Sequence, residues 1–265
     1  MARTVATTRT VASRRSSAVK HSYSYRFNGS TYITLDTNNQ FVSTSPFACS
    51  FWADFGAYAL VSNAVLRNIW SFKTDLGGGY CVAMTGFTTG TAITAGPATP
   101  PTNFVKIQHT TTATGRDALR RGWHMITVTY DGVSPTTLSS YKLYIDGVSQ
   151  TISTNATGNT INNNNSIGAS GSSFPAGIGT LLTRCRAWSG GSAMTAAQVA
   201  DLYYDDTLPS GPTLIREYLF TEGSGSTVAD TSGGGFNGTI TVAGTWSSDV
   251  PRLSRTVATT TRTVA

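Results

Sequence analysis

The chain has 265 residues, of which 39% are hydrophobic and only 12% are charged. No stretch reaches the roughly 20 apolar residues of a membrane-spanning helix, and residues 1–20 lack the apolar core of a secretory signal, so we expect folding in a cytoplasm. Cys49, Cys81 and Cys185 are odd in number and widely spaced, which argues against a disulfide framework or a cysteine metal site and favours buried thiols.

The positive charge is confined to the two ends of the chain. Residues 1–20 and 252–265 contain eight of the 19 basic residues and no acidic residue. The region between them therefore carries 11 basic and 13 acidic residues, so the formal net charge of +6 comes from the ends. We call residues 1–22 the N-terminal arm and residues 252–265 the C-terminal arm.

Both arms carry nearly the same phrase, built from two copies of Arg-Thr-Val-Ala. Thr and Val favour extended backbone, and such a strand can add to the edge of a neighbouring sheet with Val as anchor and Arg free to pair with acids. We therefore expect the arms to bind other subunits through Arg3, Val5, Arg9, Val11, Arg255, Val257, Arg262 and Val264. The alternatives are plain basic tails and contact with packaged nucleic acid.

Between the arms, residues 23–251 show alternating apolar patterns typical of strands. Strands are predicted over residues 25–27, 32–35, 47–55, 68–73, 80–84 and 104–109, with a glycine-rich hairpin at 77–79. Residues 86–103 are rich in Thr, Gly and Pro and predict a long loop. In residues 47–55, Phe47, Cys49, Phe51 and Phe55 share one face, which we expect to point into a core.

The stretch from residue 122 to 152 contains the strongest strand pattern. His124, Ile126 and Val128 point to one side and their neighbours to the other. A second strand, over 141–145, ends in Asp146-Gly147, which predicts a two-residue hairpin turn. A long apolar strand followed by such a hairpin is typical of the middle of a β-sandwich.

The last third of the chain contains an Asn-rich loop over residues 154–165, a helix and a late strand. The sequence Thr195-Ala-Ala-Gln198 is a capping box and predicts a short helix through residue 203. The late strand is predicted over residues 214–220.

Several ordered motifs resemble those of laminin-G-like, concanavalin A-like jelly-roll domains, of the sort found in phage and viral structural proteins. They are "YRFNGSTYITL" (25–35), "FACSFWADF" (47–55), "GWHMITVTYDG" with "YKLYIDGVSQ" (122–150), "NNSIGAS" (164–170) and "AMTAAQVADLY" (193–203). The resemblance implies an all-β, two-sheet antiparallel jelly-roll sandwich over residues 23–251, with one short helix and extended arms. Residues 216–246 resemble the segment that commonly precedes the first strand in that family. Such a permutation requires the two chain ends to lie close together at one edge.

The residues indicate no catalytic set. The chain has only two glutamates, Glu217 and Glu222. They would lie on opposite faces if both were in one strand, and we expect Glu222 to lie beyond it, so the paired carboxylates of glycosidases on this fold are missing. We expect His124 to be a half-buried packing residue. The resemblance also implies a calcium site at the sandwich rim, for which Asp230 and Asn237 match best; the alternative is a turn in which Asp230 accepts backbone N–H groups. No cofactor is expected to be required.

A sugar site would need an exposed aromatic side chain beside polar partners. The candidates are Tyr58, Tyr80, Trp188, Tyr203, Tyr204 and the Asn-rich loop, and the sequence does not select among them. Because the fold hosts lectins, hydrolases, adhesion modules and virion proteins, function does not follow from it. The favoured hypothesis is a non-enzymatic virion protein, forming a capsid decoration, minor capsid or tail component, that self-associates through its arms. The alternative is a carbohydrate-binding module or adhesin that recognises surface glycans.

Overall fold

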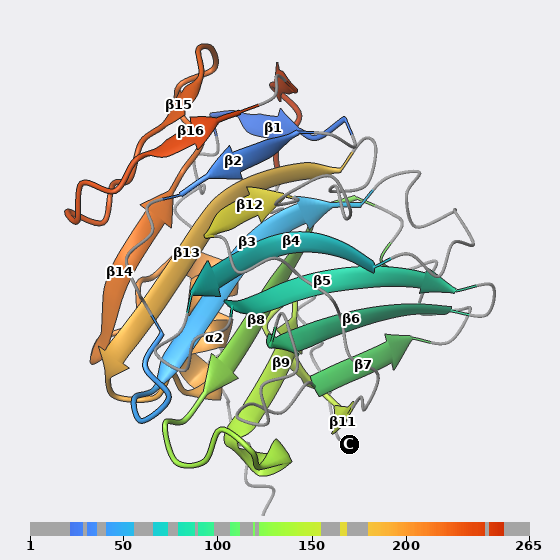
Figure 1. Cartoon of the computed structure of the whole chain (residues 1–265), viewed down its shortest axis with the longest axis vertical. Helices are drawn as coiled ribbons and strands as arrows, with labels where there is room; N and C mark the ends of the chain where they lie inside the picture. The colour runs from blue at the N-terminus through green and yellow to red at the C-terminus, as the bar shows by residue number, and fades with distance from the viewer. Residues whose placement is uncertain are drawn as a thin grey trace, which may run out of the picture.

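Two antiparallel sheets face each other and form a β-sandwich of jelly-roll type, as expected (Figure 1). A computed structural model describes residues 22–28, 31–35, 41–55, 66–73, 79–87, 90–97, 107–111, 119, 122–154, 165–168, 180–241 and 244–251. Within these residues one α-helix, α2 (Ala196–Asp205), and one 3-10 turn, η2 (Leu138–Ser140), accompany the strands.

Sheet A has eight described strands. Their order is β10 (Val148–Gln150), β9 (Tyr141–Ile145), β8 (His124–Tyr130), β3 (Phe47–Asp54), β13 (Leu181–Gly191), β1 (Ser24–Arg26) and β17 (Thr245–Ser247), with β14 (Pro212–Tyr218) beside the second half of β13.

Sheet B has nine described strands. Their order is β11 (Ser153–Thr154), β7 (Ile107–Thr111), β6 (Gly90–Pro97), β5 (Gly79–Phe87), β4 (Leu66–Lys73), β12 (Ser166–Gly168), β2 (Tyr32–Thr34), β16 (Gly238–Ile240) and β15 (Thr227–Val228).

The main core lies between the sheets and follows the predicted alternation. Phe47, Cys49, Phe51 and Phe55 are all buried in it, opposite residues of sheet B such as Trp70. Ile126 and Val128, which were predicted to share one side of their strand, also join this core. Cys49 and Cys185 are buried thiols, as predicted, and burial raises the pKa of Cys49 to about 12.

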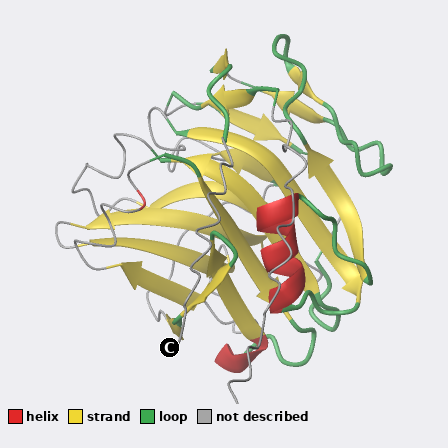
Figure 2. Cartoon of the chain, turned by 180° about the vertical axis from the view of Figure 1, so that it is seen from behind, coloured by secondary structure: helices red, strands yellow, loops and turns green. Residues whose placement is uncertain are grey.

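A second apolar cluster lies on the outer face of sheet A, beneath helix α2. Figure 2 shows the helix lying against this face. The strand positions that alternate with the core residues, including Trp52, Met125 and Trp188, pack against Val199 and Leu202 of the helix. Thr195 caps the helix: its hydroxyl accepts the Gln198 N–H and the Gln198 side chain accepts the Thr195 N–H, which confirms the predicted capping box.

The turn between β9 and β10 lies against helix α2. Asp146 and Gly147 both have positive φ, +52° and +77°, and connect β9 to β10 as the predicted two-residue hairpin. A side chain at position 147 would lie 3.2 Å from Cβ of Tyr203, so Gly147 also lets helix α2 approach the hairpin.

The loop predicted over residues 86–103 is wrong for its central part. Residues 90–97 form β6, which pairs along its length with β5 and then with β7. Ile93 and Ala95 point into the core and are 2% and 1% exposed. Burial of this short Thr-Ala-Ile-Thr-Ala alternation outweighs the loop-like Gly, Thr and Pro content around it. The next strand is β7 (Ile107–Thr111), and residues 104–106 of the predicted strand lie outside the described residues.

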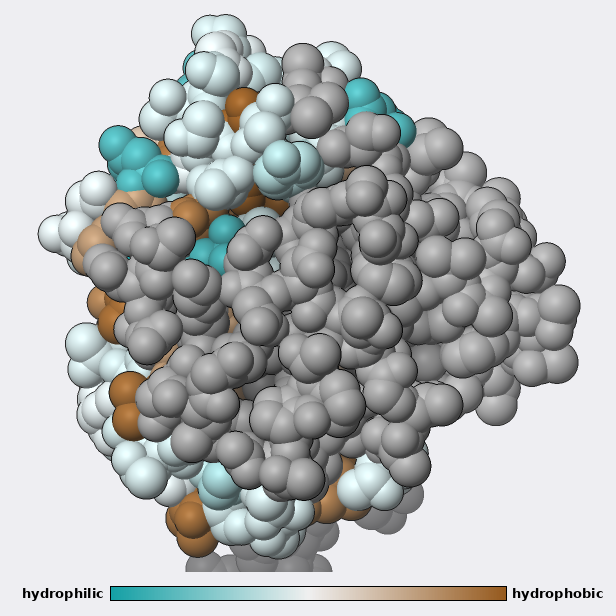
Figure 3. Space-filling model, viewed as in Figure 1, coloured by the Kyte–Doolittle hydropathy of each residue, from teal (hydrophilic) through white to brown (hydrophobic). Residues whose placement is uncertain are grey.

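In the view of Figure 3, the described surface is mostly pale or hydrophilic, with hydrophobic residues scattered in small groups. Uncharged polar residues therefore cover most of the described surface in this view, as the low content of charged residues indicates.

Candidate functional site

The two ends of the sandwich lie side by side at one edge of sheet A. Strand β17 pairs antiparallel with β1, with Ser24 opposite Ser247, and β17 is the last strand of the sheet on that side. The Ser24 hydroxyl donates a hydrogen bond to the carbonyl oxygen of Asp249 at 2.5 Å. The prediction that the chain ends meet at one edge is thus confirmed for the described residues. Apart from Ser22, the arms lie outside the described residues, as do all eight arm residues named above.

The segment that follows β17 is tied to the beginning of β8. The indole N–H of Trp123 donates to the Asp249 carboxylate at 3.3 Å. Pro251, the last described residue, is buried. Since Trp123 also packs against the cluster beneath helix α2, residues 248–251 lie close to the outer face of sheet A.

Several aromatic side chains lie on or over this outer face, and we call four of them, Trp123, Trp52, Tyr203 and Tyr204, the aromatic row. The rings of Trp52 and Tyr203 stack with their centroids 5.4 Å apart and an interplanar angle of 19°. Tyr204 meets Tyr203 edge-on at 4.8 Å. The exposed fraction rises from 3% at Trp52 through Tyr203 to 41% at Tyr204. The buried Trp52 thus supports Tyr203, which in turn supports the exposed ring of Tyr204.

Asp146 lies beside the row and is held by the first two residues of β8. Its Oδ1 accepts the Met125 N–H at 2.9 Å, and its Oδ2 lies 2.7 Å from Nδ1 of His124. The pKa of Tyr203 is raised to about 12, first by burial, then by the negative charge of Asp146 and by Tyr204. His124 is half-buried, as predicted, but its contact with Asp146 was not predicted from the sequence.

Two more carboxylates share a helix face with the exposed tyrosine. Asp201, Tyr204 and Asp205 are spaced three and four residues apart, which places them on one side of α2. Asp201 and Asp205 are partly exposed. Such an exposed aromatic ring can stack on a guanidinium group while the flanking carboxylates neutralise its positive charge. It can also pack against the apolar face of a sugar.

Of the other aromatic candidates, Trp188 cannot be an exposed platform. It lies beneath the helix and is 1% exposed, because helix α2 and the β14 residue Leu214 cover this part of the sheet. The prediction that listed Trp188 is therefore wrong. Tyr58, the side chain of Tyr80 and most of the Asn-rich loop lie outside the described residues.

The structure brings Asp230 and Asn237 together in one turn. Both oxygens of Asp230 accept backbone N–H groups, from Glu217 and Ser232 at 2.9 and 3.0 Å and from Phe236 at 3.1 Å. The side-chain oxygen of Asn237 accepts the Asp230 N–H at 3.0 Å. These contacts are those of the alternative turn interpretation. No cluster of three His, Cys, Asp or Glu residues suited to a metal ion occurs within the described ranges, and calcium binding stays a prediction.

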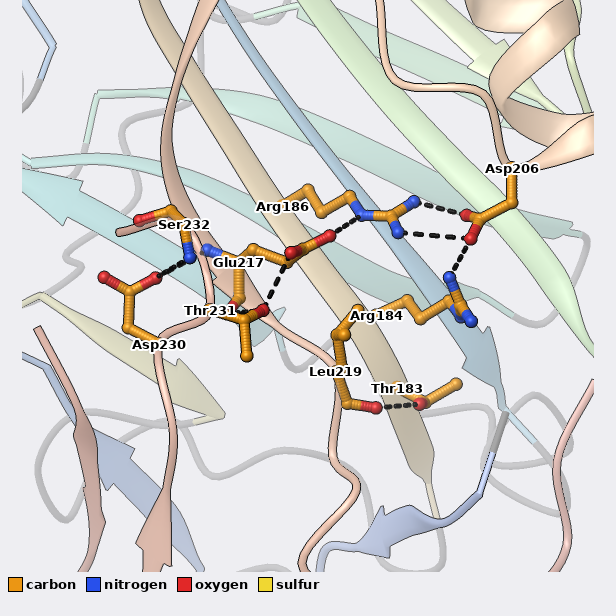
Figure 4. A network of polar contacts seen from close by, with 9 residues as sticks. All are labelled: Thr183, Arg184, Arg186, Asp206, Glu217, Leu219, Asp230, Thr231 and Ser232. Carbon is orange, nitrogen blue, oxygen red and sulfur yellow. Dashed lines mark hydrogen bonds and ion pairs between the residues drawn. The ribbon is translucent and has the colours of Figure 1, made fainter. Parts of the chain in front are cut away.

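A buried ion network lies between the helix C-terminus and strands β13 and β14 (Figure 4). Arg186 donates through Nε to Glu217 at 2.8 Å and also binds Asp206, the C-cap residue of α2. Arg184 binds the same Asp206 carboxylate from a β-bulge, where its φ is +47°. Thr231 donates to the second oxygen of Glu217 at 2.7 Å, so the network joins four segments of the chain.

Sequence analysis missed this network because its members lie far apart along the chain. The signal that could have indicated it is the pair of arginines in an otherwise apolar strand, "LLTRCRAW", since buried arginines need acidic partners. Glu217 is engaged by Arg186 and Thr231, while Glu222 accepts the Ala229 N–H, so the two glutamates have separate roles.

Comparisons with known proteins find only distant structural similarity. No family model matches it, and no curated protein matches it. Solved structures similar to it include the botulinum neurotoxin serotype D binding domain, with 12% identity over 68% of this chain and 41% of that chain and a TM-score of 0.42. Another is the receptor binding domain of botulinum neurotoxin mosaic serotype C/D, with 11% identity over 69% of this chain and 50% of that chain and a TM-score of 0.36.

The chain thus spans only about half, or less, of the length of those domains. Within the described ranges, no helix is long and apolar enough to cross a membrane. What the protein does has to be inferred from its own residues.

Proposed function

We propose that the chain is a non-enzymatic structural protein of a virus particle, joined to neighbouring subunits by its two arms. The observation that carries the proposal is the pairing of Ser24 with Ser247. This pairing brings the starting points of two arms with nearly the same basic sequence to one place on the sandwich. A laminin-G-like jelly roll, as the sequence motifs indicate, would then be the body that the arms attach to the particle.

Two tethers that leave from one point favour binding to a repeating surface. Once one Arg-Thr-Val-Ala unit is bound, the others are held at a high effective concentration near equivalent sites. Contacts that are weak one by one can then hold a subunit in place. A particle built of many identical subunits presents such a repeating surface.

The test is incorporation into particles made in the host. The full chain should sediment with the particles, and a chain lacking residues 1–21 and 252–265 should stay folded but remain at the top of the gradient. Circular dichroism of the purified shortened chain checks that it is folded. Normal incorporation of the folded, shortened chain would refute the proposal.

Point substitutions separate strand-like binding from charge alone. Proline in place of Val5, Val11, Val257 and Val264 should prevent incorporation, because proline removes backbone donors while every charge is kept. The matched control replaces Arg3, Arg9, Arg255 and Arg262 by lysine, which keeps every charge and tests whether the guanidinium groups themselves are needed. If the arms instead bind packaged nucleic acid, the proline variant should incorporate normally and binding should weaken steeply with salt.

A further inference from the structure

We infer that the aromatic row and its flanking carboxylates form a docking site for an Arg-Thr-Val-Ala unit from the arm of a neighbouring copy of this chain. The inference rests on the proposed function of the arms and names the surface that they bind. Four observations lead to it: charge, ring geometry, the position of the arms and the length of the sheet edges.

The charges of the sandwich and of the arms are complementary. Of the 11 basic residues between the arms, Arg184, Arg186 and Arg216 are buried, whereas of the 13 acidic residues only Glu217 is buried among those described. Among the described residues, the surface of the sandwich therefore carries more acidic than basic side chains. Four acidic residues lie around the row: Asp146, Asp201, Asp205 and Asp249. The last turn of helix α2, which carries the exposed ring, contains no basic residue.

The exposed ring of Tyr204 matches a guanidinium in shape and chemistry. It is 41% exposed and fixed edge-on against Tyr203, which in turn stacks on the buried Trp52. An arginine stacked on such a ring can also donate hydrogen bonds to a nearby carboxylate. Arginine is the charged residue that begins each repeated unit of the arms.

The arms start beside the row. Asp249, two residues before the last described residue, accepts a hydrogen bond from Trp123 at one end of the row. From there the 14 residues of the C-terminal arm can span about 46 Å when extended, close to the width of a domain of this size. Each chain has two similar arms but one such row among its described residues, so the row of a chain cannot hold both of its own arms.

Most sheet edges of this sandwich are short. The terminal strands β10 and β17 have three residues each, and β11 and β15 have two. Short edge strands offer few backbone hydrogen bonds to an added strand. The exception is β14, which has seven residues and pairs with β13 alone among the described strands, so cross-links to its peptide would place the site there.

The experiment is photo-cross-linking in the full-length chain, with p-benzoylphenylalanine in place of Val257. Chains of natural isotope content are mixed with ¹⁵N-labelled chains, irradiated and digested, and the linked peptides are identified by mass spectrometry. We expect links from residue 257 to peptides containing Trp123 or Tyr203 and Tyr204. About half of these links should join a labelled to an unlabelled chain, the statistical share for exchange between copies.

Substitutions at the row give the second measurement. Tyr204→Ala combined with Asp201→Asn should lower the yield of these links about tenfold, the loss expected for a cation–π contact with its ion pair. Tyr23→Ala is the matched control, because Tyr23 is 37% exposed and lies outside the row. Its yield should not change.

Several outcomes would overturn the inference. Links confined to one isotope would mean that each arm docks on its own chain, and links only to other peptides would place the site elsewhere. Glycan-array binding that is lost in Tyr204→Ala, without any arm link, would make the row a sugar site. In each of these cases, loss of particle incorporation on arm deletion would still support the proposed function, so the two failures are distinguishable.

Discussion

Replacing Glu217 by glutamine should destabilise the sandwich by about 3 kcal/mol, because it removes one partner of a buried ion pair. The Glu217 side chain is 11% exposed and that of Arg186 is 5% exposed. The four charges of the network, two arginines and two carboxylates, sum to zero, and Glu217→Gln leaves an uncompensated positive charge. We place the loss at the low end of the usual range because the glutamine oxygen can still accept from Arg186.

Urea unfolding followed by tryptophan fluorescence measures this loss, and the melting temperature should fall by about 6–12 °C for a domain of this size. Glu222→Gln is the matched control: Glu222 lies outside the network and accepts the Ala229 N–H at 2.8 Å, so its loss should stay below about 1 kcal/mol.

A double substitution tests the charge argument directly. Arg186→Met with Glu217→Gln leaves Arg184 paired with Asp206 and restores a net charge of zero. The double variant should therefore lose about 1–3 kcal/mol less than the two single losses added together. Additive losses, or a loss below about 1 kcal/mol for Glu217→Gln alone, would refute the reasoning.

Three further predictions concern helix α2 and its surroundings. Thr195→Ala should cost about 1 kcal/mol in urea unfolding, since it removes the capping box; no change would mean that the cap contributes nothing. In a difference titration against Tyr203→Phe, the Tyr203 hydroxyl should ionise near pH 12 and not near its usual value of 10.0, and Asp146→Asn should lower this pKa. The stability due to Tyr203 is then fully present below pH 10.0 and lost as the pH rises through about 12; an ionisation near 10 would contradict this. Gly147→Ala should cost about 1–2 kcal/mol in thermal unfolding, because alanine is strained at a φ of +77°, and a neutral effect would show that the turn rearranges freely.

The parts of the fold that the sequence predicted depend on local signals. The alternation of Phe47, Cys49 and Phe51 identified the inward face of β3, because neighbouring side chains in a strand must point to opposite faces. The Asp146-Gly147 turn and the Thr195 cap are likewise specified by adjacent residues.

The parts that it missed depend on contacts between distant residues. Alternation predicts that Trp188 faces away from the core, but it does not predict that helix α2 covers that position. Arg186 lies 31 residues from Glu217 and 20 from Asp206, and no spacing rule connects them. The same limit applies to the aromatic row, which combines a residue of β3, the residue before β8 and two residues of the helix.

The first strands of the chain have only late partners. Strand β1 pairs with β13 and β17, and β2 pairs with β12 and β16. The Ser24 hydroxyl, for example, donates a hydrogen bond to the carbonyl oxygen of Ser247, which is made 223 positions later. By contrast, β4 to β7 and β8 to β10 pair with their neighbours in sequence and can form early during synthesis. The strand next to the N-terminal arm is therefore among the last to be fixed. If the arms bind as proposed, this order of folding keeps an incompletely folded chain from presenting both arms at a single point, so that binding by the arms follows folding.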